Sequence, residues 1–255
     1  MPKTRVALVT GAGTGIGRAI AFRLAQDGFN VAISDQLCNE PGLTTLVAEI
    51  RELGRKVVAV TADVSVEVEI QGMIQRTVEE LGQLDVMVAN AGVMRFKPFL
   101  ETTSDDWQKI FAVNGLGTFL CYQYAAKQMI AQGHGGKIIG ACSGSGKQAE
   151  PMMSAYSSSK FAIRGLTQAT AVELGQYGIQ VNAYAPGAIE TPMIREIGEI
   201  VGDWEALKAQ EVRKAPVGRF GIPEDISNLV SFLASDQSEF ITGQTIPING
   251  GRLCD

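Results

Sequence analysis

The stretch Thr10-Gly11-Ala12-Gly13-Thr14-Gly15-Ile16-Gly17 decides the fold class of this chain of 255 residues. It follows a β-branched and aliphatic run at residues 5–10 and precedes residues 18–25, whose apolar side chains have helical spacing. A glycine turn between a strand and a helix lets a pyrophosphate approach the backbone, where free N–H groups and the positive end of the helix dipole meet its charge. The pattern therefore predicts a phosphate-binding turn at the start of a dinucleotide-binding fold.

An acidic residue, Asp35, ends the next predicted strand, residues 30–35, about twenty residues after the glycines. This is the spacing of a group that hydrogen-bonds the adenosine ribose, and a carboxylate there repels a 2′-phosphate. Neither Thr14 nor Gln36 supplies a positive charge for such a phosphate. We expect NAD as the cofactor. NADP is the alternative, because Arg18 is a nearby cation that could bind a 2′-phosphate. The alternative for Asp35 itself is a solvated loop residue without a ligand.

Strand and helix patterns alternate along the whole chain. Such alternation predicts right-handed crossovers and a parallel sheet with helices on both faces. We expect a Rossmann-type α/β fold in which seven strands follow the doubly wound order 3-2-1-4-5-6-7, in a single domain over residues 1–255. The predicted strands lie near Val6, Val31, Val57, Val86, Ile138, Val181 and Ile246.

Tyr156 and Lys160 stand four residues apart in a predicted helix, so both side chains lie on one helix face. A free tyrosine, with a pKa of about 10, holds its proton too tightly to act as a base near neutrality. A neighbouring ammonium would lower this pKa and make general acid–base catalysis feasible. The alternative is a pair of ordinary neighbours on a helix surface.

Ser143 lies just after a strand-like run at residues 137–141, where a strand ends and a loop starts. In open α/β sheets ligands bind at this edge, where a serine hydroxyl can hydrogen-bond a substrate oxygen. A plain loop serine is the alternative.

Seven motifs in order identify a resemblance to the short-chain dehydrogenase/reductase family over essentially the whole chain. They are the glycine stretch at residues 10–17, Asp63-Val64, Ala89-Asn90-Ala91-Gly92, Asn114, Ser143, Tyr156 with Lys160, and Pro186-Gly187 with Thr191. The resemblance implies a nicotinamide-dependent oxidoreductase that interconverts alcohols and carbonyl compounds.

The resemblance also implies four catalytic roles. Tyr156 donates a proton to the carbonyl oxygen in reduction and accepts it in oxidation. Lys160 binds the nicotinamide ribose and lowers the pKa of Tyr156, Ser143 orients the substrate oxygen, and Asn114 holds a water that relays protons toward Lys160.

The cofactor contacts implied by the resemblance form a larger set. Asp63 and Val64 match adenine contacts, Asn90 lines the adenosine side, and Ile189 and Thr191 hold the carboxamide. The full set is Gly11, Thr14, Gly15, Ile16, Gly17, Asp35, Asp63, Val64, Asn90, Gly92, Tyr156, Lys160, Pro186, Gly187, Ile189 and Thr191.

Within the family the chain is most similar to diacetyl/acetoin reductases, also called 2,3-butanediol dehydrogenases, through residues 141–143, 156–162, 164–168 and 191–193. We expect reduction of diacetyl or acetoin, or oxidation of 2,3-butanediol. Gly144 and Ile194 depart from the glutamine and tryptophan that bacterial members tend to carry there. The alternatives are a polyol or sugar alcohol, a 3-oxoacyl thioester, a bulkier ketone, or a non-catalytic NAD-sensing protein. The expected substrate pocket comprises Ser143, Gly144, Glu150, Met193 and Ile194.

Residues 193–216 interrupt the alternation after the sixth predicted strand and mix apolar side chains with charges. Their position after the sixth strand predicts that they lie over the active-site edge, and the family resemblance implies a mobile substrate lid there, with Met193 and Trp204 as candidate pocket walls. The alternative is a helix packed on the core.

Composition excludes several other functions. The net charge is −5 with 19% charged residues and no lysine-rich run, so we expect neither a nucleic acid nor a membrane as partner, but a small carbonyl or alcohol. The four cysteines are scattered without a Cys-x-x-Cys pair, which predicts no disulfide framework and no metal site. The one histidine, His134, lies in a glycine-rich loop unsuited to Ser-His-Asp hydrolysis.

The amino terminus shows no signal-peptide pattern, and the uncharged residues 110–126 are too few and too polar for a membrane span. We expect a cytoplasmic protein. Helical stretches at residues 107–130 and 155–174 have apolar residues on more than one face, as in helices buried between subunits. The family commonly forms tetramers, so a homotetramer is expected.

Overall fold

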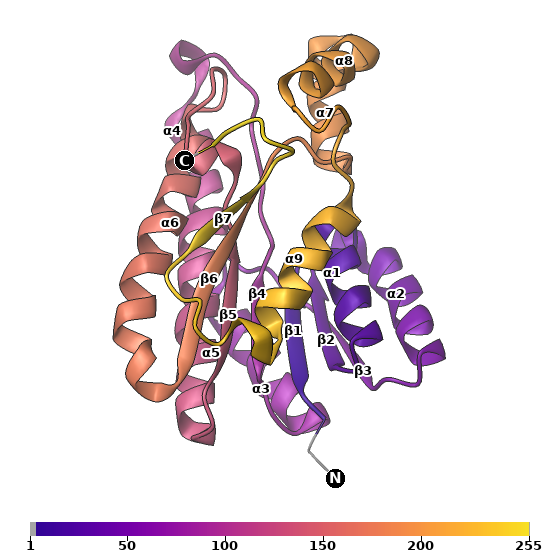
Figure 1. The fold of residues 1–255 in the computed structure, drawn as a ribbon, viewed down its shortest axis with the longest axis vertical. Helices are drawn as coiled ribbons and strands as arrows, with labels where there is room; N and C mark the ends of the chain where they lie inside the picture. Colours follow the sequence, from indigo (N-terminus) through magenta and orange to yellow (C-terminus); the bar gives the residue numbers. More distant parts are fainter. Residues whose placement is uncertain (1–3, 255) are drawn as a thin grey trace.

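Seven parallel strands form one sheet in the order β3-β2-β1-β4-β5-β6-β7 in a computed structural model, which describes residues 4–254 (Figure 1). The predicted strand order and every predicted strand are confirmed. The strands are β1 (Val6–Thr10), β2 (Asn30–Asp35), β3 (Val57–Thr61), β4 (Val86–Ala89), β5 (Gly136–Ala141), β6 (Ile179–Pro186) and β7 (Thr245–Ile248).

Helices cover both faces of this sheet, as predicted (Figure 1). One face carries α1 (Gly15–Gln26), α2 (Glu40–Glu52) and α9 (Pro223–Ala234). The other carries α3 (Glu67–Leu81), α5 (Thr118–Gln132) and α6 (Ser154–Leu174), with the short α4 (Ser104–Ile110) against α6.

Two apolar cores result, one on each side of the sheet. In β1, Ala7 and Val9 point into the core under α1 and α9, whereas Leu8 points into the core under α3 and α5. Successive strand residues face opposite sides, so a strand buried on both faces needs a continuous apolar run. This requirement explains why β1 reads Val-Ala-Leu-Val with no polar alternation.

A π-helical segment, Phe111–Gly117, separates α4 from α5. The sequence had predicted one helical stretch over residues 107–130, and the structure corrects this expectation. Gly117 lies so close to the loop after β3 that a β-carbon would approach the carbonyl oxygen of Val64 to 2.9 Å. The segment also contains Asn114, whose side chain is fully buried. Such segments are frequent at functional sites.

The predicted lid region folds into two helices, α7 (Pro192–Val201) and α8 (Trp204–Lys214), which stand beyond the carboxyl ends of the strands (Figure 1). They follow β6 and lie on the same side of the molecule as the loops after β4 and β5. Mobility of this α7–α8 segment stays a prediction. No helix within residues 4–254 is long and apolar enough to span a membrane.

Candidate active site

A cavity of about 620 Å³ opens at the carboxyl edge of the sheet. Residues at or just beyond the ends of all seven strands contribute to its wall, and α7 and α8 close one side. The edge of an open α/β sheet is where ligands bind. The wall contains nearly all the predicted site residues, namely Gly11, Thr14, Gly15, Ile16, Gly17, Asp35, Val64, Asn90, Gly92, Ser143, Gly144, Glu150, Tyr156, Lys160, Pro186, Gly187, Ile189, Thr191, Met193 and Ile194.

The glycine turn has the geometry that a pyrophosphate requires. Gly11 and Gly15 have φ of 65° and 54°, in the left-handed region that favours glycine. A β-carbon at Gly17 would lie 2.1 Å from the carbonyl oxygen of Gly11, so only glycine lets α1 start so close to β1. Thr14 precedes α1 without a side-chain cap, and no acidic residue lies in the first turn. The first N–H groups of α1 are thus available to an anion.

Asp35 is fixed beside this turn. Its Oδ2 accepts a hydrogen bond from the N–H of Gly13 at 2.8 Å, and its Oδ1 accepts from the Gln36 N–H at 2.8 Å and from Asn39 Nδ2 at 2.9 Å. Arg18 is not in the cavity wall, since its guanidinium binds both carboxylate oxygens of Glu49 at 2.6 and 2.7 Å. The cavity wall therefore carries a negative charge beside the glycine turn, and the nearby cation Arg18 is paired with Glu49.

Asn90 links the glycine turn to the neighbouring strands. Its Nδ2 donates to the carbonyl oxygens of Thr10 at 2.9 Å and Gly11 at 3.1 Å, and its Oδ1 accepts from the Tyr184 hydroxyl at 2.7 Å. Asp63 lies outside the wall: its carboxylate accepts hydrogen bonds from Gln36 Nε2 and from the N–H and hydroxyl of Ser65. Its adenine contact stays a prediction.

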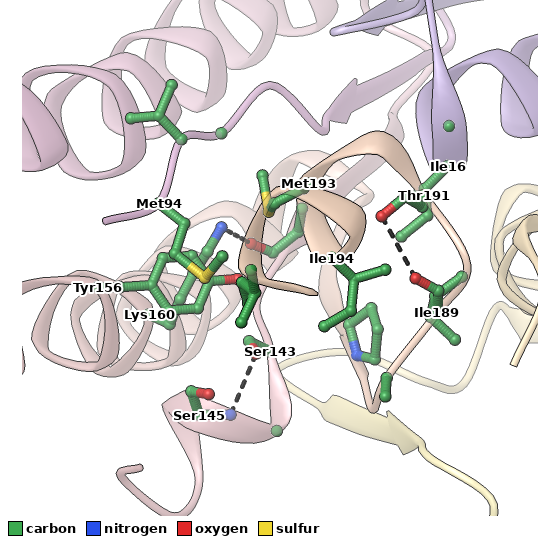
Figure 2. A pocket seen from close by; sticks show the side chains of 18 of the residues that line it. Ile16, Met94, Ser143, Ser145, Tyr156, Lys160, Ile189, Thr191, Met193 and Ile194 are labelled. Carbon is green, nitrogen blue, oxygen red and sulfur yellow. Dashed lines mark hydrogen bonds between the residues drawn. The ribbon is translucent and has the colours of Figure 1, made fainter. Parts of the chain in front are cut away.

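Tyr156 and Lys160 project from one face of α6 toward the end of β5, where Ser143 lies (Figure 2). The Lys160 Nζ lies 5.5 Å from the centroid of the Tyr156 ring and donates to the carbonyl oxygen of Ala141 at 2.7 Å. The Ser143 hydroxyl accepts from the Ser145 N–H at 3.1 Å and shares a hydrogen bond with the Tyr156 phenol. Three of the four predicted catalytic side chains thus meet in the cavity.

Asn114 is buried behind this wall rather than in it. Its Oδ1 accepts from the Val93 N–H at 2.9 Å, while its Nδ2 donates to the Val93 carbonyl at 2.9 Å and to Ser159 Oγ at 3.0 Å. It therefore fastens the loop after β4 to α6. A β-carbon at Gly92 would lie 3.3 Å from Asn114 Oδ1 and 3.4 Å from Lys160 Nζ, so glycine keeps that space open. The relay role of Asn114 stays a prediction.

The pKa of Tyr156 differs from the sequence-based expectation of a lowered value. Burial raises the pKa of Tyr156 to about 12, although the hydrogen bond with Ser143 acts in the opposite direction. Burial also lowers the pKa of Lys160 to about 8. Both charged forms lose hydration in the closed site, and the ammonium is directed at Ala141 rather than at the phenol oxygen. The structure therefore favours a protonated Tyr156, which suits a proton donor.

The segment after β6 faces the glycine turn across the cavity. A β-carbon at Gly15 would lie 3.3 Å from the Thr191 methyl group, and the Thr191 hydroxyl donates to the carbonyl oxygen of Ile189 at 3.3 Å (Figure 2). Ile189 and Thr191 thus lie in the cavity wall beside the glycine turn, and their contact with the carboxamide stays a prediction.

The substrate end of the cavity is more apolar than predicted. Four of the chain's eight methionines, Met94, Met152, Met153 and Met193, line it within the described part of the chain. Figure 2 shows Met94 and Met193 near Tyr156 and Ser143. Of these four methionines, the sequence analysis predicted only Met193 as a pocket residue. The other three lie in loops that follow β4 and β5, a topological signal that could have revealed them. Phe96, Ile197, Val201, Leu207 and Leu253 are among the other apolar residues of the cavity wall.

Met152 has φ of 66°, the only positive value at a non-glycine residue within residues 4–254. Its carbonyl oxygen accepts a hydrogen bond from the Lys97 N–H at 2.7 Å, which joins the loop before α6 to the loop after β4. A left-handed methionine is strained, and such residues cluster at functional sites.

The sheet order, the glycine turn, the half-buried Ser143 and the buried Tyr156 and Lys160 define a Rossmann-type oxidoreductase that uses a nicotinamide dinucleotide. A family model described as enoyl-(acyl carrier protein) reductase matches residues 11–252. The chain belongs to the short-chain dehydrogenase/reductase family.

Relatives and a solved structure agree with this assignment. A short-chain dehydrogenase/reductase of Armillaria gallica is 55% identical, over 98% of this chain and 97% of its own. A diacetyl reductase [(S)-acetoin forming] of Staphylococcus epidermidis is 42% identical, over 98% and 99%. The crystal structure of acetoin dehydrogenase from Enterobacter cloacae superimposes with a TM-score of 0.88 at 36% identity, covering 99% of this chain and 96% of that one.

Proposed function

We propose that this protein interconverts a neutral secondary alcohol and its ketone with NAD(H). The observation that carries the proposal is one continuous cavity with Ser143, Tyr156 and Lys160 at one end and the glycine turn with Asp35 at the other. Such an arrangement holds a carbonyl oxygen beside a proton donor while a dinucleotide spans the sheet edge.

The chain's own groups have distinct tasks in this reaction. The Tyr156 phenol, protonated in the free site, donates its proton to the carbonyl oxygen in reduction and accepts it in oxidation. The Ser143 hydroxyl, already hydrogen-bonded to that phenol, orients the same oxygen. Lys160 holds a positive charge near the developing alkoxide and is positioned to bind ribose hydroxyls. The bound nicotinamide would supply or take up the hydride.

NAD is the proposed cofactor, because Asp35 faces the ribose position and Arg18 is paired with Glu49. A 2′-phosphate would meet the carboxylate without a free cation beside it. The observed glycine turn fits the pyrophosphate of either nucleotide, so the ribose position decides between them.

Diacetyl and acetoin are the first substrate candidates. The Staphylococcus epidermidis relative and the Enterobacter cloacae structure carry names for these compounds, and both align over nearly the whole chain. A neutral diketone also suits a cavity whose charged side chains at the substrate end, Glu150, Glu211, Lys214 and Arg252, are all paired with one another.

A bulkier apolar ketone is the second candidate, and a specific observation favours it. The four methionines and the surrounding aliphatic side chains give a wide wall that adapts its shape. Gly144 and Ile194 occupy positions where a glutamine donor and a tryptophan wall would narrow and polarise the pocket. A small diketone would leave much of this apolar surface uncovered.

Initial rates of NADH oxidation test these proposals. The substrates are diacetyl, acetoin and a series of cyclic and polycyclic ketones, each also measured with NADPH and with the Tyr156→Phe variant. Faster NADH turnover with diacetyl supports the small diketone, and a kcat/KM that rises with ring number supports the bulky ketone. NADH binding without turnover of any ketone would instead point to a nucleotide-sensing protein and overturn the proposed activity.

A further inference from the structure

Four charged side chains form a continuous chain of ion pairs along the substrate end of the cavity. Lys214 Nζ lies 2.9 Å from Glu211 Oε1, and Arg252 contacts Glu211 Oε2 at 2.5 Å through one nitrogen and Glu150 Oε1 at 2.9 Å through the other. All four residues line the cavity. We call this set the ion-pair chain.

The ion-pair chain joins three segments that are distant in the sequence. Glu211 and Lys214 belong to the last turn and a half of α8, Arg252 lies in the turn after β7, and Glu150 lies in the loop before α6. Arg252 stands at the centre, because it is the group that contacts two other segments. Neither Glu211, Lys214 nor Arg252 was predicted as a site residue from the sequence.

Arg252 projects from a firmly held turn. Its N–H donates to the Asn249 carbonyl at 3.2 Å, and Asn249 Nδ2 donates to the Leu253 carbonyl at 2.9 Å. The Gly250 carbonyl accepts from the Val217 N–H at 3.1 Å, just after α8. The backbone that carries the Arg252 side chain is therefore fixed at the edge of the sheet.

By contrast, α8 has few other attachments to the body of the protein. Among the described helices and strands, α7 is the one against which α8 packs extensively. At its first residue, Trp204 makes an edge contact with Phe220, and Lys208 lies 3.9 Å from Glu190. In the carboxyl-terminal half, the ion pair between Glu211 and Arg252 links α8 to the turn after β7.

Burial makes this dependence strong. The Glu211 side chain is 8% exposed, and each of its two carboxylate oxygens has one cationic partner. A buried carboxylate is tolerated only when it is paired, so loss of Arg252 would favour movement of Glu211 toward water. Because Glu211 is part of α8, the helix would move with it, and the cavity wall would change shape.

We propose that Arg252 is a positioning residue that holds α8 over the substrate end and so sets the size of alcohol or ketone that the site accepts. The inference rests on the proposed secondary-alcohol activity. Arg252 acts through Glu211 and Glu150, not on the reacting atoms. While the ion-pair chain holds α8 in place, the cavity excludes oversized substrates. When α8 is released, the wider cavity binds small substrates more weakly.

Hydrogen exchange of residues 204–214 tests the positioning without any need for turnover. The variants are Arg252→Met, Arg252→Lys, Glu150→Gln and, as a matched control, Arg76→Met, which removes an exposed arginine paired with Glu80 within α3. In Arg252→Met we expect exchange in α8 to accelerate about tenfold or more, as local opening becomes easier, with the sheet unchanged. Arg252→Lys and Glu150→Gln should give smaller increases, and Arg76→Met none. Unchanged α8 exchange in Arg252→Met would overturn the proposal.

Steady-state kinetics provide the second readout. For Arg252→Met we expect KM for the smallest active ketone to rise about tenfold, kcat to change by less than about threefold and NADH affinity to stay the same, since the loosened helix affects substrate confinement. Arg252→Lys should recover part of the loss. An equal fall in kcat and NADH affinity, or an unaltered ratio between small and large ketones, would contradict the positioning role. If the wild-type protein turned over no ketone, the proposed function would fail, while the exchange experiment would still decide the role of Arg252.

Discussion

Tyr156 is the residue whose chemistry the site constrains most closely. Burial keeps its phenol protonated, and Ser143 and Lys160 surround it. Replacement by phenylalanine removes only the hydroxyl, so we expect Tyr156→Phe to lower kcat by about 10²–10⁴-fold, the usual contribution of general acid catalysis. NADH affinity, measured by fluorescence titration, should stay within about twofold because the ring still packs on the wall. Near-normal turnover would remove Tyr156 from the proton-transfer step.

Asp35 is expected to discriminate between the two nucleotides. Its carboxylate is fixed by three hydrogen bonds and carries the negative charge that a 2′-phosphate would meet. In Asp35→Ala we expect the ratio of kcat/KM for NADH to that for NADPH to fall by at least about tenfold, equal to about 1.4 kcal/mol. The comparable change Asp236→Ala, at an exposed aspartate that pairs with Arg5 away from the cavity, serves as a control on the surface charge. An unchanged ratio in Asp35→Ala would contradict the ribose contact.

The pKa values of Tyr156 and Lys160 predict opposite pH profiles for the two directions. Reduction needs the protonated phenol, which persists up to a pKa of about 12, and the Lys160 cation, which is lost as pH rises through about 8. We therefore expect kcat/KM for the ketone to be level below pH 7 and to fall above pH 8. Oxidation needs a deprotonated phenol, and below the pKa of Tyr156 the deprotonated fraction grows tenfold per pH unit. The ratio of kcat/KM for alcohol oxidation to kcat/KM for ketone reduction should therefore rise with pH. A ratio that stays constant from pH 6 to 10 would argue against this assignment.

The sequence predicted which residues form the site better than it predicted their burial and protonation. Glycine spacing, Asp35 and the Tyr156–Lys160 pair are local patterns, and the structure places all of them at one cavity. The raised pKa of Tyr156 depends on burial, and the position of Asn114 depends on contacts with Val93 and Ser159, 21 and 45 residues away. No local pattern encodes either property.

At the scale of elements, the turn between β1 and α1 is the most tightly constrained. A β-carbon at Gly17 would lie 2.1 Å from the Gly11 carbonyl oxygen, which is backbone and cannot rotate away. We expect Gly17→Ala to lower the free energy of unfolding by about 1–3 kcal/mol through overpacking and to weaken NADH binding. Gly72→Ala is the matched control: nothing lies within 4 Å of its β-carbon position in α3, so it should stabilise the helix by about 1 kcal/mol. Equal effects in urea titrations of both variants would refute this account of the turn.

Elements with long, regular patterns were predictable, and those shaped by tertiary contacts were not. The five inner strands carry largely buried runs, and the alternation of strand and helix patterns predicted the doubly wound sheet. The π-helical segment Phe111–Gly117 arises where Gly117 meets the loop after β3, a contact between distant residues. The attachment of α8 likewise depends on Arg252, which follows Glu211 by 41 residues.

At the scale of the whole molecule, we propose a homotetramer, because several large apolar side chains on α4, the π-helical segment, α5 and α6 are substantially exposed. Trp107, Leu116, Phe119, Phe161 and Val172 are between 40% and 85% exposed. Phe161 directly follows Lys160 on α6, so the same helix turn that supports the catalytic site also presents an apolar surface. Exposed apolar residues that gather on adjacent elements are typical of subunit interfaces.

Light scattering after size-exclusion chromatography checks this assembly. We expect the wild-type protein to elute with about four times the 27.2 kDa chain mass, and Phe161→Glu to shift toward smaller species because a carboxylate would be buried without a partner at the interface. Val68→Glu, on the exposed face of α3, is the matched control and should leave the mass unchanged. Turnover should fall together with the tetramer in Phe161→Glu, since Lys160 is the preceding residue of the same helix. A wild-type protein that stays monomeric at micromolar concentration would contradict the proposal that these apolar faces form subunit interfaces.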